Sequence, residues 1–385
     1  MHHHIVSTFR RPRLARASLA TALLMTAAAC GSSADSNAGG GTTDPAFLAD
    51  AKAAYTEATT IPSTWQGPTE PVKVAKNLDV TLIQCDARLS GCVAPLDEIE
   101  KVGQKYGWSS KTQDAGSDPA KANQQIVSAV DSGSDVIFVV GLDPLLIQQG
   151  LAAADKAGIP VILGEGGTSS PNPVVDPEGK PWVTVDVAPP YPAMGQAAAN
   201  YIITDSDGKG SALLVTSKEL RGTALHIDAA AARLKECAGC TSETINVSPA
   251  NVGTTVADDI VAYVRSHPEV GYIYVGYDPI AAVAIPALQK AGMAGRVKVI
   301  GILGSAQNVQ MTREGLQAGD MAFDLRYTGY AMVDQAFRAL AGVELSEPNG
   351  ENVPWYFLTK ENPPEGDTWF APFDYIGEYS KIWTS

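Results

Sequence analysis

Several charged side chains directly follow apolar stretches of the sequence, where they could make polar contacts with a small molecule. Asp86 and Arg88 follow the apolar run Val80–Gln84, and an Asp/Arg pair can direct a fork of hydrogen bonds onto a hydroxyl or carboxylate group. A solvated loop fits the same two residues equally well. Glu165 follows a second apolar run, and Arg221 lies in a polar loop after a third.

Other candidates combine a chemical role with a plain structural one. Asp143 and Asp278 each precede a proline, so they could contact a ligand or could only cap a helix. Tyr277 stands beside Asp278 and offers an aromatic face. The last candidates lie beside an apolar strand, where charged and aromatic residues are unusual for a plain connector: Asp324, Arg326 and Tyr327.

Motifs of the common enzyme and cofactor classes are missing from the sequence. It contains no GxSxG, HExxH or GxxxxGK[ST] pattern, and three of its five histidines are residues 2–4. The stretch 205–216 begins like a calcium loop, but Thr216 stands at the twelfth position, which must be acidic. We therefore expect a protein that is not an enzyme and that carries no cofactor and no metal.

The elements that would position the candidate side chains alternate along the chain. From Val80 onward an apolar strand, a polar loop and an amphipathic helix recur, which predicts a mostly parallel sheet. Val136–Val140 is apolar at every position, so helices must cover both faces of that sheet. The first of these helices is expected to begin at Pro95. These strand–loop–helix units are too many for one doubly wound sheet, so we predict an α/β protein of two similar lobes. A closed eight-fold barrel is the competing fold.

The N-terminus has the features of an export signal. Met1–Ala29 combines a basic segment with an apolar run that is too short to span a membrane. Ala-Ala-Cys followed by Gly-Ser-Ser resembles a bacterial lipoprotein cleavage site, which would leave a lipidated Cys30 at the new N-terminus; an ordinary secretory signal is the alternative. The Gly/Ser-rich stretch Ser32–Thr43 would then tether the protein to the membrane. The formal net charge of −14 disfavours nucleic acid as a partner.

The cysteine count fits export. Apart from Cys30, the cysteines form two close pairs, and such pairs usually bond outside the cytoplasm. A zinc site built from both pairs and a redox CxxC at the second pair are weaker alternatives. The predicted disulfides are Cys85–Cys92 and Cys237–Cys240.

Longer stretches of the sequence resemble a known family. VTLIQCD, SDPAKANQQIVSAVDSGSDVIFVVGLDP, AADKAGIPVILGEGG and GYIYVGYDPIAAVAIPALQKAG are similar to the type I periplasmic binding proteins of the ribose-binding, lactose-repressor-like superfamily. Within it, the chain looks like the substrate-binding lipoproteins of sugar-type ABC transporters. The resemblance implies two doubly wound parallel-sheet lobes joined by a three-strand hinge, with a ligand in the cleft. An ABC permease in the membrane would recognise the closed form. We expect a monomer.

The resemblance also implies where the domains begin and end. The expected parts are a signal peptide at 1–29, a lipid-anchored tether and N-terminal extension at 30–71, an N-terminal lobe at 72–187 with 325–350, and a C-terminal lobe at 188–324 with 351–385. The hinge crossovers are expected near Val185–Pro189, Asp324–Tyr327 and Gly350–Trp355. The segment Thr368–Trp383 is expected to cap the second lobe.

The function that the resemblance implies is an extracytoplasmic receptor that delivers a sugar or sugar-like ligand to an ABC importer. Gly166 stands where ribose-type receptors have an arginine, which disfavours a pentose ligand. Leu303 stands where they have an aspartate, and Tyr277 where many relatives have an asparagine. These two departures favour a less hydroxylated ligand, so an aromatic acid or a nucleoside-like compound is the alternative. A sensor that presents its ligand to a signalling partner and a hydrolase on the same scaffold are the competing functions.

Overall fold

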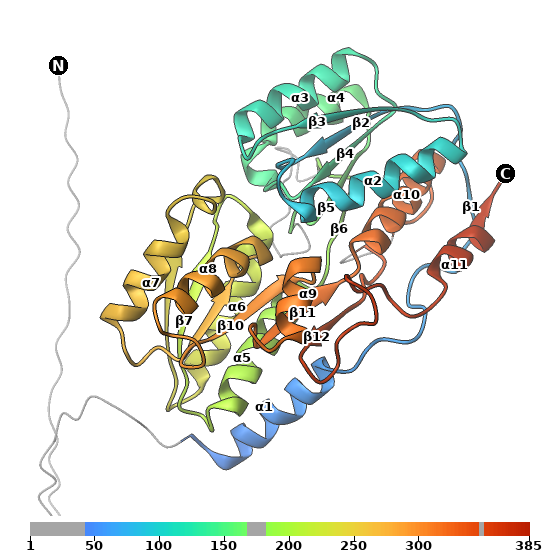
Figure 1. The fold of residues 1–385 in the computed structure, drawn as a ribbon. Coiled ribbons are helices and arrows are strands. Elements are labelled where there is room, and N and C mark those ends of the chain that lie inside the picture. Colours follow the sequence, from blue (N-terminus) through green and yellow to red (C-terminus); the bar gives the residue numbers. More distant parts are fainter. Residues whose placement is uncertain (1–42, 168–181, 346–349) are drawn as a thin grey trace, which may run out of the picture. The chain divides into compact units, whose positions relative to one another are not determined.

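Parallel sheets flanked by helices form the core of the protein, as the alternation of the sequence predicts. The computed structural model describes residues 43–167, 182–345 and 350–385, which fall within a single unit. The strands form a five-stranded sheet, a six-stranded sheet and a short two-stranded pair (Figure 1). We call the five-stranded sheet with its helices the first lobe, and the six-stranded sheet with its helices the second lobe.

The first lobe is built on strands that all run parallel, in the order β3-β2-β4-β5-β6. Its strands are β2 (Asp79–Gln84), β3 (Ser109–Asp114), β4 (Val136–Val140), β5 (Val161–Gly164) and β6 (Val185–Val187). Its helices are α2 (Ser90–Lys105), α3 (Pro119–Asp131), α4 (Gln148–Ala157) and α10 (Leu325–Ala341), with the short 3₁₀ helix η1 (Pro144–Leu146). Strand β4 is buried at every position because α3 and α4 pack on one face of the sheet and α2 and α10 on the other.

The second lobe repeats this arrangement in the strand order β12-β11-β10-β9-β7-β8, with β12 antiparallel to its neighbour. Its strands are β7 (Ser211–Thr216), β8 (Thr241–Asn246), β9 (Tyr272–Val275), β10 (Lys298–Leu303), β11 (Gly319–Phe323) and β12 (Trp355–Leu358). Its helices are α1 (Pro45–Ala58), α5 (Tyr191–Asp205), α6 (Arg221–Glu236), α7 (Val256–Ser266), α8 (Asp278–Lys290) and α9 (Ala306–Arg313), with the 3₁₀ helix η2 (Pro249–Asn251). Helices α5 and α6 pack together, as do α7 and α8.

The start of α2 differs from the sequence-based expectation. The helix begins at Ser90, and Pro95 lies inside it rather than at its first position. Cys92 is disulfide-bonded to Cys85 at the end of β2, with the two Cα atoms 5.5 Å apart. This bond holds residues 90–94 against the end of the strand, so the first helical turn forms ahead of the proline. The loop after β2 is therefore only five residues long and ends at Leu89.

Three chain segments cross between the lobes where the sequence places them. They are the links from β6 to α5, from β11 to α10, and from α10 to β12. Tyr327 in the first turn of α10 donates a hydrogen bond to the carbonyl oxygen of Glu351 at 2.6 Å, which ties two of these crossovers together. Buried Glu351 also accepts a hydrogen bond from Tyr379 near the end of the chain.

Two further segments join the lobes. Helix α1 packs on α5 of the second lobe, and the chain then runs to β1 (Val72–Lys73) beside α10 of the first. After β12 the chain returns to α11 (Tyr375–Ile382), which packs on α10, and to β13 (Trp383–Thr384), which pairs with β1 (Figure 1). The expectation that Thr368–Trp383 caps the second lobe is therefore wrong, because the end of the chain completes a strand pair on the first lobe.

The second cysteine pair, Cys237 and Cys240, is also disulfide-bonded and closes the turn between α6 and β8. No described helix is long and apolar enough to cross a lipid bilayer. The predicted signal peptide, Cys30 and most of the predicted tether lie outside the described residues.

Candidate functional site

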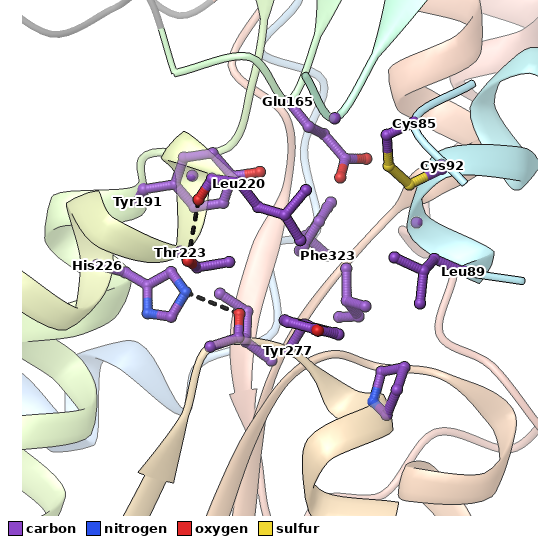
Figure 2. Close-up of a pocket in the computed structure, with 17 residues that line it drawn as sticks. Cys85, Leu89, Cys92, Glu165, Tyr191, Leu220, Thr223, His226, Tyr277 and Phe323 are labelled. Carbon is purple, nitrogen blue, oxygen red and sulfur yellow. Dashed lines mark hydrogen bonds between the residues drawn. A yellow bond between two sulfur atoms is a disulfide. The ribbon is translucent and has the colours of Figure 1, made fainter. Parts of the chain in front are cut away.

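A cavity lies between the two lobes, where the carboxyl ends of both parallel sheets face each other (Figure 2). This edge is the usual ligand position in open α/β sheets. The cavity has a volume of about 60 Å³, and the empty space around it, which includes the part open to solvent, amounts to about 520 Å³. The first lobe contributes Cys85, Leu89, Gly91, Cys92, Gly141 and Glu165; the second contributes chiefly Tyr191, Leu220, Thr223, His226, Tyr277, Leu303 and Phe323.

The Cys85–Cys92 disulfide forms part of the first wall (Figure 2). Gly141, at the end of β4, packs directly against it. A Cβ atom at this position would lie 2.7 Å from the Cys85 Sγ atom, and the backbone has a φ of 73°. Both observations require glycine here. The disulfide and this close backbone approach give the wall a fixed shape.

Glu165 supplies the acidic group of the first wall. It follows β5 with a φ of 58°, a conformation that costs a non-glycine residue energy and that often marks a functional position. The side chain is buried, and its Oε1 atom has no hydrogen-bond partner in the described part of the chain. Burial raises the pKa of the Glu165 carboxyl well above its usual value, and the negative charge of Asp186 raises it further.

The second wall is built from the first turns of α5 and α6. Tyr191 begins α5, and its ring passes directly over Gly222 in the first turn of α6. A Cβ atom on Gly222 would lie 2.8 Å from the Tyr191 Cζ atom, so glycine makes room for the ring. His226, one turn further along α6, packs between Tyr191 and Tyr274 with ring centroids 6.0 and 5.2 Å away.

His226 fixes the loop that carries the next wall residue. Its Nε2 atom lies 3.1 Å from the carbonyl oxygen of Gly276. A carbonyl oxygen can only accept a hydrogen bond, so Nε2 carries the proton. Burial lowers the pKa of His226 to about 3, so the imidazole is neutral near pH 7. We infer that this bond holds the backbone before Tyr277.

Tyr277 and Leu303 complete the second wall. The Tyr277 hydroxyl is buried without a hydrogen bond of normal geometry among the described residues, and burial raises its pKa to about 12. Leu303 ends β10 with a φ of 132°, a strained conformation for a branched side chain. Its Cδ2 atom lies 3.2 Å from the place where a Cβ atom on Gly91 would stand. The two lobes therefore touch across the cavity, and the structure shows them closed.

The cavity brings together two of the ten residues that the sequence predicted for the ligand site, Glu165 and Tyr277. Asp86 and Arg88 lie near the cavity but pair with each other, with Arg88 Nε and Nη2 at 2.8 and 2.6 Å from the two carboxylate oxygens. Ser117 donates a third bond to Asp86, and these bonds hold the pKa of the buried Asp86 carboxyl well below its usual range. The Asp86 carboxylate is therefore already fully engaged.

Two of the predicted aspartates have structural partners. Asp143 accepts a hydrogen bond from the Leu145 amide at 2.9 Å and so caps η1. Asp278 accepts bonds from the amides of Ile302 and Ser305 at 3.1 and 2.8 Å and shares a hydrogen bond with buried Asp320. Burial raises the pKa of both Asp143 and Asp278. Neither side chain lines the cavity.

The predicted hinge residues form a buried polar and aromatic cluster away from the cavity. Asp324 caps α10 by accepting from the Tyr327 amide and also accepts from the Ala371 amide, both at 2.9 Å. Arg326 donates to the Tyr375 hydroxyl at 2.6 Å and lies over the Phe370 ring. These contacts join the crossover at the start of α10 to the C-terminal segment.

Arg221 lies at the edge of the cavity rather than in its wall. Its Nε atom donates to the carbonyl oxygen of Gly167 across the lobe boundary at 3.1 Å. The residues that the sequence did not single out are Tyr191, Leu220, Thr223 and Phe323, and His226, which had no evident partner in the sequence. The proline before Tyr191 marks a helix start, but only the crossover from β6 brings that start to the cavity.

The described residues contain no group of three histidine, cysteine or acidic side chains that could hold a metal ion. The wall chemistry instead suits an organic ligand. A few polar groups, Glu165, Tyr191 and Tyr277, are set among leucine, isoleucine and phenylalanine side chains.

Comparison with known proteins identifies relatives of the whole two-lobed fold. A family described as "Periplasmic binding protein domain" matches residues 92–344, well over half of the chain. No match is found among curated protein sequences.

Solved structures share the fold at low sequence identity. An ABC transporter solute-binding protein from Agrobacterium vitis with bound D-fucose is 15% identical, with a TM-score of 0.67 over 76% of this chain and 100% of its own. A 5-methylthioribose transporter protein from Thermotoga lettingae is 16% identical, with a TM-score of 0.65 over 75% and 88% of the two chains. The fructose-binding periplasmic domain of a hybrid two-component system is 18% identical, with a TM-score of 0.64 over 74% and 92%.

Proposed function

Because the chain belongs to the periplasmic binding protein family, we propose that it is an extracytoplasmic receptor that captures a small sugar-like solute for an ABC importer. The family match and the two-lobed fold confirm the type I resemblance seen in the sequence. The observation that carries the proposal is the cavity between the lobes, in whose walls the Glu165 Oε1 atom and the Tyr277 hydroxyl are buried without a hydrogen bond of normal geometry to any described residue. Buried polar groups normally have partners, and a bound solute would supply them.

Ligand capture would follow the closure of the two lobes. The cavity walls come from different lobes, so opening would separate Leu303 from Gly91 and expose both walls to solvent. A solute that binds both walls shifts the population toward the closed form. A permease that contacts both lobes would then distinguish loaded from empty receptor. Neither lobe closure nor recognition by a permease requires a chemical reaction, so we propose that the protein binds its solute and does not transform it.

The ligand class follows from the wall chemistry and from the structural neighbours. Two of those neighbours bind sugars in which a methyl group replaces a hydroxymethyl group or a methylthio group replaces a hydroxyl, whereas others bind fully hydroxylated compounds such as D-allose and myo-inositol. Leu303, Leu220 and Phe323 give this cavity an apolar portion that would suit such a group. A sugar-like compound with reduced hydroxylation therefore fits better than a fully hydroxylated hexose. An aromatic acid fits less well, because no lysine or arginine stands among the described lining residues to pair with its carboxylate.

Attachment to the outer face of the membrane would keep the receptor near its permease. We propose that Cys30 carries lipid after removal of residues 1–29, and that the Gly/Ser-rich stretch that follows forms the tether. Replacing Cys30 with alanine would then release the protein, as a monomer, into the soluble fraction. Protein that remained membrane-bound would count against lipidation.

The test is a thermal-shift panel on the purified protein, with neutral sugars, deoxy sugars, polyols, sugar acids, amino sugars and nucleosides. A ligand that binds the folded state raises the melting temperature in a concentration-dependent way. Uptake of the best compound should be lost when the gene is deleted. A panel without any shift, combined with no bound compound in the purified protein, would overturn the receptor proposal.

A sensor is the second candidate, because one structural neighbour is the fructose-binding periplasmic domain of a hybrid two-component system. Deletion of the gene distinguishes an importer receptor from a sensor. An importer receptor is needed for uptake of the labelled compound, whereas a sensor is needed only for the transcriptional response to it.

A further inference from the structure

The described residues of the cavity wall include an acidic side chain but no lysine or arginine. Among the described lining residues the titratable groups are Glu165, Tyr191, His226 and Tyr277, and none is lysine or arginine. The nearest cation along the rim, Arg221, directs its Nε atom to the Gly167 carbonyl oxygen instead. Recognition of an anionic ligand normally uses arginine or lysine, and this wall offers neither.

The surroundings of Glu165 favour its neutral form. Asp186 on β6 is the charged neighbour that acts on it, and it repels a second negative charge. Tyr191 on α5, Gly91 on α2 and Leu303 on β10 approach from the other sides and bring no positive charge. Burial raises the pKa of the Glu165 carboxyl strongly. The raised pKa favours the protonated carboxyl group, which has one hydroxyl donor.

The direction of the carboxyl group makes this donor available. Figure 2 shows it pointing from the end of β5 into the space between the disulfide and Tyr191. Its Oε1 atom has no partner within the described chain. Leu220, Leu303 and Phe323 line the same cavity. The cavity thus offers a neutral hydrogen-bond donor and an apolar surface.

We propose that the site selects an uncharged ligand, which accepts a hydrogen bond from the Glu165 carboxylic acid and lays an apolar group against Leu220, Leu303 and Phe323. This inference rests on the proposed receptor function and specifies its ligand. A carboxylate or phosphate would be buried here without a lysine or arginine among the described lining residues to pair with it. An ammonium group would need several acceptors, and the Gly276 carbonyl in the wall is already bonded to His226. Burying a lone ion pair also rarely gives a net gain.

Substitution of Glu165 directly tests whether its carboxyl group donates a hydrogen bond to an uncharged ligand. Glu165→Gln keeps the shape of the side chain and a hydrogen-bond donor at every pH. We expect it to bind the neutral ligand within about threefold of the wild type. Wild-type affinity should fall as the pH rises and Glu165 ionises, while Glu165→Gln should show no such fall. Glu361→Gln, in an exposed loop outside the cavity, is the control and should follow the wild type.

The probes are matched compounds that differ in one group: D-fucose, D-galacturonate and 6-amino-6-deoxy-D-galactose for one ring, and 5-methylthioribose with ribose 5-phosphate for another. Isothermal titration should detect binding for a neutral member and none for its charged partners. Tighter binding of a charged partner, or loss of neutral-ligand binding in Glu165→Gln, would overturn the inference while leaving the receptor function intact. If no compound binds and none co-purifies, the receptor function itself fails, and this inference fails with it.

Discussion

Arg221 of the second lobe donates a hydrogen bond from its Nε atom to the carbonyl oxygen of Gly167 in the first lobe, at 3.1 Å. The bond lies at the edge of the cavity, and separation of the lobes would break it. We therefore expect it to stabilise the closed form, alongside the contact between Leu303 and Gly91.

Replacing Arg221 with alanine should favour the open form. A hydrogen bond from a partly exposed charged donor contributes about 1 kcal/mol, which corresponds to a roughly fivefold weaker affinity for the ligand. Small-angle X-ray scattering of the ligand-free protein should show a larger radius of gyration. Lys218→Ala, an exposed residue in the same loop, is the control. If both variants scatter and bind like the wild type, Arg221 does not stabilise the closed form.

Gly222→Ala should damage the second wall without unfolding the protein. The new Cβ atom would stand 2.8 Å from the Tyr191 ring, so the ring must leave its place in the cavity. We expect a loss of affinity of at least about tenfold, consistent with overpacking costs of about 1 to 3 kcal/mol. Gly253→Ala is the matched control, since a Cβ atom there meets nothing within 4 Å. Equal affinities for the two variants would place the ligand away from Tyr191.

The two disulfides allow a comparison of binding with stability. Replacing either pair with serine should lower the free energy of unfolding by about 2 kcal/mol, because each closes a short loop. Removal of Cys85–Cys92 should in addition weaken ligand binding, because that bond forms part of the cavity wall. Removal of Cys237–Cys240 should leave binding unchanged. Equal binding after both replacements would show that the wall does not depend on the disulfide.

The buried pair Asp278 and Asp320 should make stability depend on pH. Burial raises the pKa of both carboxyls in the folded protein, so the folded state holds a proton that the unfolded state releases near pH 4. The free energy of unfolding should therefore decrease as the pH rises from about 4 toward the folded pKa values. Asp278→Asn should flatten this slope, as measured by denaturant unfolding between about pH 5 and 8. Parallel curves for the wild type and variant would contradict the shared proton.

Much of the fold could be predicted from the sequence because the signal is local. Apolar runs such as Val136–Val140 identify strands covered on both faces, and Asp-Pro pairs mark helix starts. The start of α2 was misplaced because the Cys85–Cys92 bond, and not Pro95, decides where the helix begins. The end of the chain was misplaced because the pairing of β1 with β13 joins residues more than three hundred positions apart.

The site could be predicted only where a strand end points into the cavity. Glu165 and Tyr277 follow β5 and β9, and the strand-end rule finds them. The same rule selects Asp86 and Asp278, whose carboxyl groups bond to neighbours within their own lobes. Tyr191 was missed because it enters the cavity from a helix start after a crossover. Whether a polar group faces a ligand or its own loop depends on packing that the local sequence does not encode.

Native mass spectrometry of the freshly purified protein tests most directly whether a solute occupies the cavity between the lobes. We predict one small, uncharged compound bound per chain in the wild type and in Gly253→Ala, and its absence from Gly222→Ala, in which the Tyr191 ring is displaced. The bound compound should return when the released material is added back to emptied wild-type protein. A compound retained equally by Gly222→Ala, or no bound compound and no binder among the matched probes, would contradict the claim that the cavity between the lobes is a solute site.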